Sequence, residues 1–218
     1  MNPRTGLRLA CLCLAIAIAS TCAAQAQSRY FIGAQLGIVS ATGTLEPDPP
    51  YSVTISSRTG LCIGGFAGME ISPMLSVQAG IRYTQRGAEV SGVGLKSDIS
   101  FDYVEIPVTI RVNLLTGGLR PFIFAGPSLG FLSSAESETT FLGMASTTDQ
   151  SKYAESTNIT MDFGAGAELR ISSTMGVMAG LGYSLGLSNV NKGYPDITKT
   201  TIAKHSSLNL FAGVTFGL

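Results

Sequence analysis

Charged residues are scarce in this chain, and the residues that most often carry chemistry are scarcer. Only 13% of the 218 residues are charged, the formal net charge is zero, and tryptophan is absent. No run of basic residues suggests nucleic-acid binding. His205 is the only histidine, and no stretch has the Asp and Asn spacing of a calcium loop. The sequence therefore predicts no metal site, no cofactor and no nucleic-acid partner.

Long apolar runs are also missing after the amino terminus. Beyond residue 26 no apolar stretch approaches the ~20 residues that a transmembrane helix needs. The one continuous run, Leu9 to Ala19, follows Arg4 and Arg8 and precedes Ala24-Gln25-Ala26. A basic start, a short apolar core and an A-x-A site are typical of a secretory signal. We therefore expect residues 1–26 to be a cleaved signal peptide.

Cysteine is nearly absent from the exported part. Of the four cysteines, only Cys62 lies beyond the signal, so an internal disulfide is excluded. Cys22 would suit a lipoprotein signal, but Thr21 precedes it where a small residue such as Gly, Ala or Ser is needed. The expected product is therefore one domain over residues 27–218, with Cys62 as a small packing residue.

The dominant pattern in this domain is strict alternation of apolar and polar residues, which indicates β-strands. In Asp102 to Asn113, Val104, Ile106 and Val108 share one face while Glu105 and Thr109 share the other. The opposite face is rich in glycine, serine, threonine and charge in every such segment. Eight segments show this pattern: 30–39, 61–71, 75–86, 102–113, 121–131, 159–171, 175–187 and 208–218.

The connections between these segments alternate in length. Three are short: Ser72-Pro73, Leu114 to Arg120 and Ser172 to Thr174. Four are long and polar, and we expect them to be loops: 40–60, 87–101, 132–158 and 188–207. Short turns at one end and long loops at the other are typical of outer-membrane barrels, with the turns in the periplasm. An even strand number then places both termini in the periplasm.

The fold that these observations predict is an all-β, eight-stranded antiparallel up-and-down transmembrane β-barrel. Strands can cross lipid only as a closed sheet, because every backbone hydrogen-bonding group must be paired within the protein. A soluble sandwich or lipocalin-like barrel is the alternative. The glycine-rich polar faces and the scarcity of flanking charge disfavour it, since a solvated sheet surface carries many lysines and glutamates.

Charges of both signs fall on the faces that would point inward. These residues are Glu70, Arg82, Arg86, Glu105, Arg111, Asp162, Glu168 and Arg170. Arg82 and Glu105 fall near mid-depth on neighbouring strands, so a direct ion pair is expected. An eight-stranded interior is only just wide enough for side chains, and buried charges must be paired. A structural plug is therefore favoured over a polar conduit or a gate.

One two-residue pattern raises an enzymatic alternative. His205 and Ser207 share a face if they lie on a strand, as the histidine and serine of lipid A deacylase barrels do. A histidine base and a serine nucleophile also need an orienting acid, which the sequence does not identify. Short matches of this kind are common by chance, so the sequence favours no enzyme.

Several segments together resemble the PorT-like outer-membrane β-barrel domain. They are Tyr103-Val-Glu-Ile-Pro107, Pro121-Phe-Ile-Phe-Ala-Gly-Pro127, Phe163-Gly-Ala-Gly-Ala-Glu168, Gly182-Tyr-Ser-Leu-Gly-Leu-Ser-Asn189 and Gly213-Val-Thr-Phe-Gly-Leu218. The resemblance covers nearly all of residues 27–218 and implies a small outer-membrane barrel, with no catalytic residue carried over. Many such barrels end in an aromatic residue, whereas this chain ends in Leu218.

Three functions remain open at this point. The favoured one is a non-enzymatic outer-membrane protein with a structural, adhesive or partner-binding role through the segments 40–60 and 132–158. A narrow porin-like channel and a lipid A-modifying enzyme that uses His205 and Ser207 are the alternatives. The expected partners are outer-membrane lipid, the barrel-assembly machinery and an unidentified protein or surface ligand.

Overall fold

The computed structural model describes residues 29–46, 54–92, 95–141, 144–149, 155–188 and 202–218. These residues form nine strands: β1 Arg29–Glu46, β2 Thr54–Ser72, β3 Leu75–Gly92, β4 Leu95–Asn113, β5 Leu119–Phe141, β6 Met144–Asp149, β7 Thr157–Arg170, β8 Met175–Gly186 and β9 Ile202–Gly217. Within these ranges no helix has the length and hydropathy needed to span a bilayer. The predicted signal peptide, residues 1–26, lies outside the described residues.

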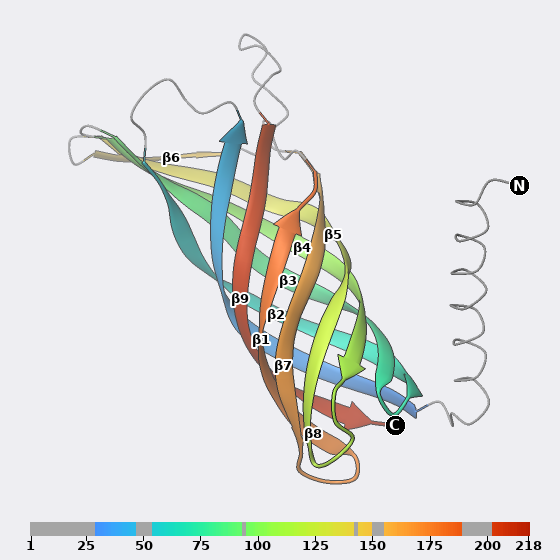
Figure 1. The fold of residues 1–218 in the computed structure, drawn as a ribbon. Helices are drawn as coiled ribbons and strands as arrows, with labels where there is room; N and C mark the ends of the chain where they lie inside the picture. Colours follow the sequence, from blue (N-terminus) through green and yellow to red (C-terminus); the bar gives the residue numbers. More distant parts are fainter. Residues whose placement is uncertain (1–28, 47–53, 93–94, 142–143, 150–154, 189–201) are drawn as a thin grey trace, which may run out of the picture.

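Eight of the strands close into an antiparallel barrel. Neighbours pair in the order β1, β2, β3, β4, β5, β7, β8 and β9, and β9 pairs back with β1. β6 pairs with β5 outside this ring, as Figure 1 shows. The prediction of an eight-stranded up-and-down barrel is therefore confirmed.

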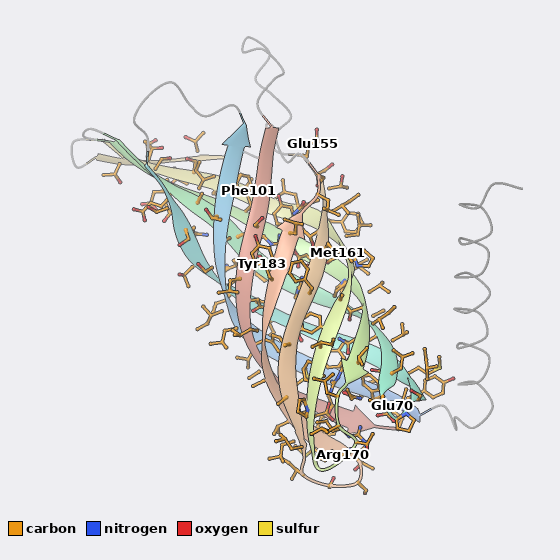
Figure 2. The ribbon with its side chains drawn as sticks, viewed as in Figure 1. Glu70, Phe101, Glu155, Met161, Arg170 and Tyr183 are labelled. Atoms are coloured by element: carbon orange, nitrogen blue, oxygen red, sulfur yellow. The ribbon has the colours of Figure 1, made fainter. Side chains whose placement is uncertain are left out.

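The two faces of the barrel wall differ sharply in chemistry. Large apolar side chains point outward, and Leu36, Leu61 and Ile63 are each more than 60% exposed. The opposite positions carry buried serine, threonine, asparagine and charged side chains. Figure 2 shows the outward side chains along the length of the strands. Exposed leucine and isoleucine in such number would be costly in water, whereas in lipid they need no cover.

The short connections lie where the sequence places them. β2 and β3 are joined by Pro73-Met74, β4 and β5 by residues 114–118, and β7 and β8 by residues 171–174. In the last turn, the backbone N–H groups of Ile171 and Ser172 both donate to the carbonyl of Met175. We call this the turn end of the barrel.

At the other end, the prediction of long loops is wrong for most of 40–60, 87–101 and 132–158. β1 and β2 occupy residues 40–46 and 54–60, β3 and β4 occupy all of 87–101 except 93–94, and β5 and β6 occupy most of 132–149. Of the fourth segment, 188–207, β9 takes residues 202–207, whereas residues 189–201 lie outside the described part of the chain.

These additional strand residues build a five-stranded extension, which we call the outer sheet. It consists of residues 54–57 of β2, 88–92 of β3, 95–102 of β4, 132–141 of β5 and all of β6. β1 and β2 pair no further than Ala41 opposite Arg58, and β1 then continues with β9 alone. Figure 1 shows the outer sheet leaning away from this β1–β9 ribbon.

Two register shifts separate the outer sheet from the barrel. Between β2 and β3, four residues after Ser57 stand opposite three after Thr84. Between β4 and β5, Ser133 is the additional residue, opposite the junction of Asp102 and Tyr103. Because Gln85 pairs with Asp102, both β-bulges lie at the same height. A bulge bends the strand that carries it, so this level is where the sheet changes direction.

Candidate functional site

The first candidate is an ionic cluster in the middle of the lumen, built by β3, β4 and β7. Arg82 lies at its centre: its Nη2 is 2.6 Å from Glu105 Oε2 and 2.8 Å from Asp162 Oδ2. Arg86 Nη2 is 2.6 Å from Glu105 Oε1. Thr84 Oγ1 also donates to Glu105, and Thr160 Oγ1 donates to Asp162. We call Arg82, Arg86, Glu105 and Asp162 the central cluster.

The register of the β3–β4 pairing explains the contact between Arg82 and Glu105 but not the contact between Arg82 and Asp162. Arg82 and Glu105 are directly opposite each other in the β3–β4 pairing, whereas Asp162 reaches Arg82 from β7, 80 residues along the chain. The two arginines balance the two carboxylates, and each of the four residues is at most 9% exposed. Buried ions of this kind hold one another in place, because removing one partner leaves an uncompensated charge.

Tyr103 and Cys62 lie beside the central cluster. Tyr103 is fully buried. It occupies an inward position two residues before Glu105, and the alternation of the strand turns both into the lumen. Cys62 is 2% exposed, and Thr84 Oγ1 lies 3.8 Å from its Sγ. Its surroundings are those of a packed thiol.

An aromatic layer lies below the central cluster. Phe122, Met178 and Phe211 form a buried group, with Phe66 and Phe124 packed against it. The Phe124 and Phe211 rings meet edge to face with centroids 6.0 Å apart. This layer separates the central cluster from the charges at the turn end.

Glycines in the facing strands make room for these rings. A Cβ added to Gly166 would lie 2.7 Å from Phe122 Cζ, and one added to Gly180 would lie 2.7 Å from Phe211 Cζ. Both would also come within 2.5 Å of a carbonyl oxygen on the neighbouring strand. The glycine-rich inner face is therefore a packing requirement of a narrow barrel.

The second ionic group, which we call the turn-end cluster, comprises Glu70, Arg111, Arg120, Glu168 and Arg170. Arg111 Nη2 donates to Glu168 Oε2 at 2.6 Å, and its guanidinium carbon lies 3.8 Å from the centroid of the Phe122 ring. Arg120 Nη1 is 3.3 Å from Glu70 Oε1. Arg170 is partly exposed at the mouth, at the same end as Glu70 in Figure 2.

Two ionic clusters and an aromatic layer thus occupy the lumen. Two cavities among the described side chains have volumes of about 40 and 50 Å³, and one water needs ~10–15 Å³ by this measure. Each cavity therefore has room for a few water molecules at most.

The outer sheet is the second candidate, and one of its faces is acidic. Glu89, Asp98 and Glu138 are directly opposite one another on β3, β4 and β5, and Glu136 lies on the same face of β5, two residues before Glu138. Arg58 Nε contacts Asp98 Oδ1 at 2.7 Å. The other face carries Ala88, Ala135 and Ser137, which are buried. Like charges directly opposite one another destabilise a sheet, and the ion pair with Arg58 offsets part of this repulsion at Asp98.

The structure describes only part of the His205 and Ser207 pair on which the enzymatic alternative depends. His205 is opposite Gly43 in the β1–β9 pairing, but its side chain lies outside the described part of the structure. Ser207 is 3% exposed, inside the lumen wall. Among the described residues, no group of three or more His, Cys, Asp or Glu is placed to hold a metal ion.

Sequence reasoning missed Arg120 as a lumen residue. The sequence places it in the turn 114–120, but β5 begins at Leu119, and Arg120 is only 7% exposed. The alternation of the strand could have identified it: Arg120 is two residues before Phe122, so both side chains lie on the same, inward face. The proline at 121 obscured the start of the strand, since proline is unusual inside a sheet.

Comparison with known proteins agrees with this architecture. The family model of the outer membrane protein β-barrel domain matches residues 23–217. The chain belongs to this family. As an outer membrane β-barrel domain it has the outer membrane as its location, and its outward leucines and isoleucines face lipid. A search of curated protein sequences gives no match.

Three solved structures show the same fold as this β-barrel domain. Neisserial surface protein A is 16% identical with a TM-score of 0.51, and the match covers 86% of this chain and 96% of that one. A major outer membrane protein from Thermus thermophilus is 13% identical with a TM-score of 0.53, covering 88% and 100%. OprG from Pseudomonas aeruginosa is 10% identical with a TM-score of 0.50, covering 89% and 97%.

Proposed function

We propose that this protein is a non-enzymatic outer-membrane barrel that holds a partner-binding sheet beyond the membrane. The observation that carries the proposal is the continuation of four barrel strands, β2 to β5, into the outer sheet, where β6 joins them above the packed lumen. β5 alone has 23 residues. At ~3.3 Å per residue it extends about 75 Å, far more than a tilted strand needs to cross an apolar band of about 25 Å.

The direction of insertion is part of the proposal. The turn end and both termini face the periplasm, and the outer sheet faces the cell exterior, as in barrels whose short turns are periplasmic. Cleavage of residues 1–26 accompanies export. We also propose that the protein is a PorT-like barrel. Five segments, among them Tyr103-Val-Glu-Ile-Pro107, support this narrower likeness.

A partner has two features of the outer sheet to recognise. The row of Glu89, Asp98 and Glu138 favours a basic surface or peptide. β6 pairs with β5 on one side, and no described strand pairs with its other edge, so an extended segment can add there through backbone hydrogen bonds. A role in adhesion or in assembly with another protein fits both features.

Surface labelling tests the orientation. We expect a cysteine introduced at Thr147, on exposed β6, to react with a membrane-impermeant maleimide on intact cells. A cysteine at Ser173, in the exposed turn 171–174, is the matched control and reacts only after the outer membrane is permeabilised. Native Cys62 is buried and gives the background. Labelling of Ser173→Cys but not Thr147→Cys on intact cells would reverse the proposed topology.

Charge variants test the partner-binding role. Glu136→Gln with Glu138→Gln should weaken adhesion of cells to a lysine-coated surface by several fold, because both side chains are exposed. Removing residues 136–149, the β5–β6 hairpin, should weaken adhesion at least as much. Both variants should keep the heat-modifiable gel mobility of a folded barrel. Adhesion that is unchanged by either alteration contradicts this role.

The two alternatives have their own measurements. Because the lumen is filled, the purified protein should show no planar-bilayer conductance above the lipid background; a stable conductance step would favour the channel. The lipid A-modifying enzyme requires deacylation activity in the wild type and its loss in Ser207→Ala. Wild-type protein without such activity ends that alternative.

A further inference from the structure

A small cavity lies within the turn-end cluster. Its volume is about 40 Å³, and the five charged side chains of the cluster line it. The hydroxyl residues Ser76 and Thr215, both at most 6% exposed, complete the inner wall. Ser173 and Thr174 of the turn lie at its mouth. Tyr30, Phe31 and Met175 add apolar surface to the lining. The cavity therefore combines a charged and hydroxyl-bearing part with an apolar part, and it adjoins solvent at the turn end.

Its charges do not balance. Three arginines line the cavity against two glutamates. Each glutamate already contacts one arginine: Glu168 is 2.6 Å from Arg111, and Glu70 is 3.3 Å from Arg120. Arg170 is the third cation, and its contribution leaves one positive charge in excess. The central cluster, by contrast, has two cations and two anions.

A buried donor adds a second, independent observation. Arg120 is 7% exposed, and its Nε–H has no hydrogen-bond partner among the described residues. A buried donor on a charged group is costly to leave without a hydrogen-bond partner. The guanidinium of Arg111 is already engaged, by Glu168 on Nη2 and by Asn113 Oδ1 on Nε. Arg120 and Arg170 are therefore the residues with capacity for a ligand.

Gly176 keeps the cavity open on the β8 side. A Cβ at this position would lie 2.7 Å from Thr215 Oγ1 and 2.9 Å from Glu168 Oε1. Any larger residue would push these groups into the space that Arg120 and Arg170 line. The room for a small molecule beside Glu168 thus depends on a residue without a side chain.

We propose that this cavity binds a small oxyanion, a carboxylate or phosphate group, between Arg120 and Arg170. Arginine presents forked N–H donors that match such groups, and the excess positive charge favours an anion over water. The volume admits one such group, not a large ligand. The oxyanion is either free phosphate or the terminal carboxylate of a peptide segment entering from the turn end. The site is distinct from the outer sheet, so it does not rest on the proposed function.

Arginine side-chain NMR on the full barrel in detergent micelles tests the proposal. Sodium phosphate and N-acetylglycine are titrated separately at constant ionic strength set with sodium chloride. We expect saturable shifts of the Nε–Hε resonances of Arg120 and Arg170. Tighter binding of phosphate identifies the free ion as the source, and tighter binding of N-acetylglycine identifies a peptide carboxylate. Shifts that never saturate, with either probe, would overturn the proposal.

Three variants make the result specific. Arg120→Gln and Arg170→Gln should each weaken binding of the preferred probe at least ten-fold. Arg58→Gln removes one positive charge from the outer sheet and should leave the affinity unchanged. If Arg120→Gln does not fold, Arg170→Gln alone decides, because this side chain is partly exposed at the mouth. Equal affinity in the wild type and Arg170→Gln would contradict the proposed site.

Discussion

The barrel wall and the outer sheet share the strands β2 to β5, yet the two regions differ in which residues they accept. β3, β4 and β5 run through both regions without a break in the chain. In the barrel, lipid lies on one side of the wall and a packed lumen on the other, so each position has one acceptable class of residue. In the outer sheet the face with Glu136 and Glu138 is exposed, and serine, threonine and acids are admitted freely. The surroundings of a strand position, lipid or water, thus determine which residue types it accepts more than the strand itself does.

The largest expected effect comes from breaking the central cluster. Arg82→Gln leaves Glu105 and Asp162 buried without their shared cation, so we expect the free energy of unfolding to fall by about 3–5 kcal/mol. Urea unfolding in lipid vesicles, followed by gel mobility, measures this. A loss below about 1 kcal/mol would mean that the cluster does not hold the lumen together.

A charge on the lipid face should cost nearly as much. Leu181 is 54% exposed on β8, and Leu181→Arg should destabilise the barrel by about 2–4 kcal/mol if it lies near the bilayer midplane. Thr147→Arg, on exposed β6 of the outer sheet, is the matched control and should change stability little. Equal effects of the two substitutions would remove the contrast between the regions.

Overpacking the aromatic layer is expected to have a smaller effect. The Cβ of Gly180→Ala meets both the Phe211 ring and the carbonyl of Ala165, so a loss of about 1–3 kcal/mol is expected. The double variant Gly180→Ala with Phe211→Leu tests the cause. If the ring is the obstacle, the smaller side chain should recover part of the loss; no recovery would assign the strain to the backbone.

The smallest effect is expected at the ion pair of the outer sheet. The Arg58 and Asp98 side chains are 30% and 41% exposed, and pairs of this kind contribute about 0–1 kcal/mol. Arg58→Gln should therefore leave the urea midpoint almost unchanged. A loss as large as that of Arg82→Gln would show that the outer sheet supports the barrel and would remove the contrast between the two regions.

The same contrast explains what the sequence could predict. Alternation identified all eight wall strands and the facing of residues such as Glu105 and Leu181, because lipid imposes a period of two. It failed above Arg86 and above Phe131, where runs such as Ser133-Ser134 and Thr139-Thr140 place polar residues on both faces. Those strands form because hairpin pairing continues upward from the barrel, and pairing partners cannot be read from hydropathy. The contact between Asp162 and Arg82 could not be predicted for a similar reason, because it depends on how the barrel closes.

The two bulges at the base of the outer sheet have a mechanical consequence. Only one additional residue on β2 and one on β5 mark the level at which the sheet bends. Below that level β4 carries Glu105 of the central cluster, and above it the same strand carries Asp98. A pull on the outer sheet therefore travels down a continuous backbone into the ion-paired lumen and loads the ladder hydrogen bonds of β4 along the strand. All the bonds of the ladder share such a load at once, whereas peeling breaks them in turn. A force applied by a bound partner would thus load the hydrogen bonds of β4 together and would not break them one after another from the edge of the sheet.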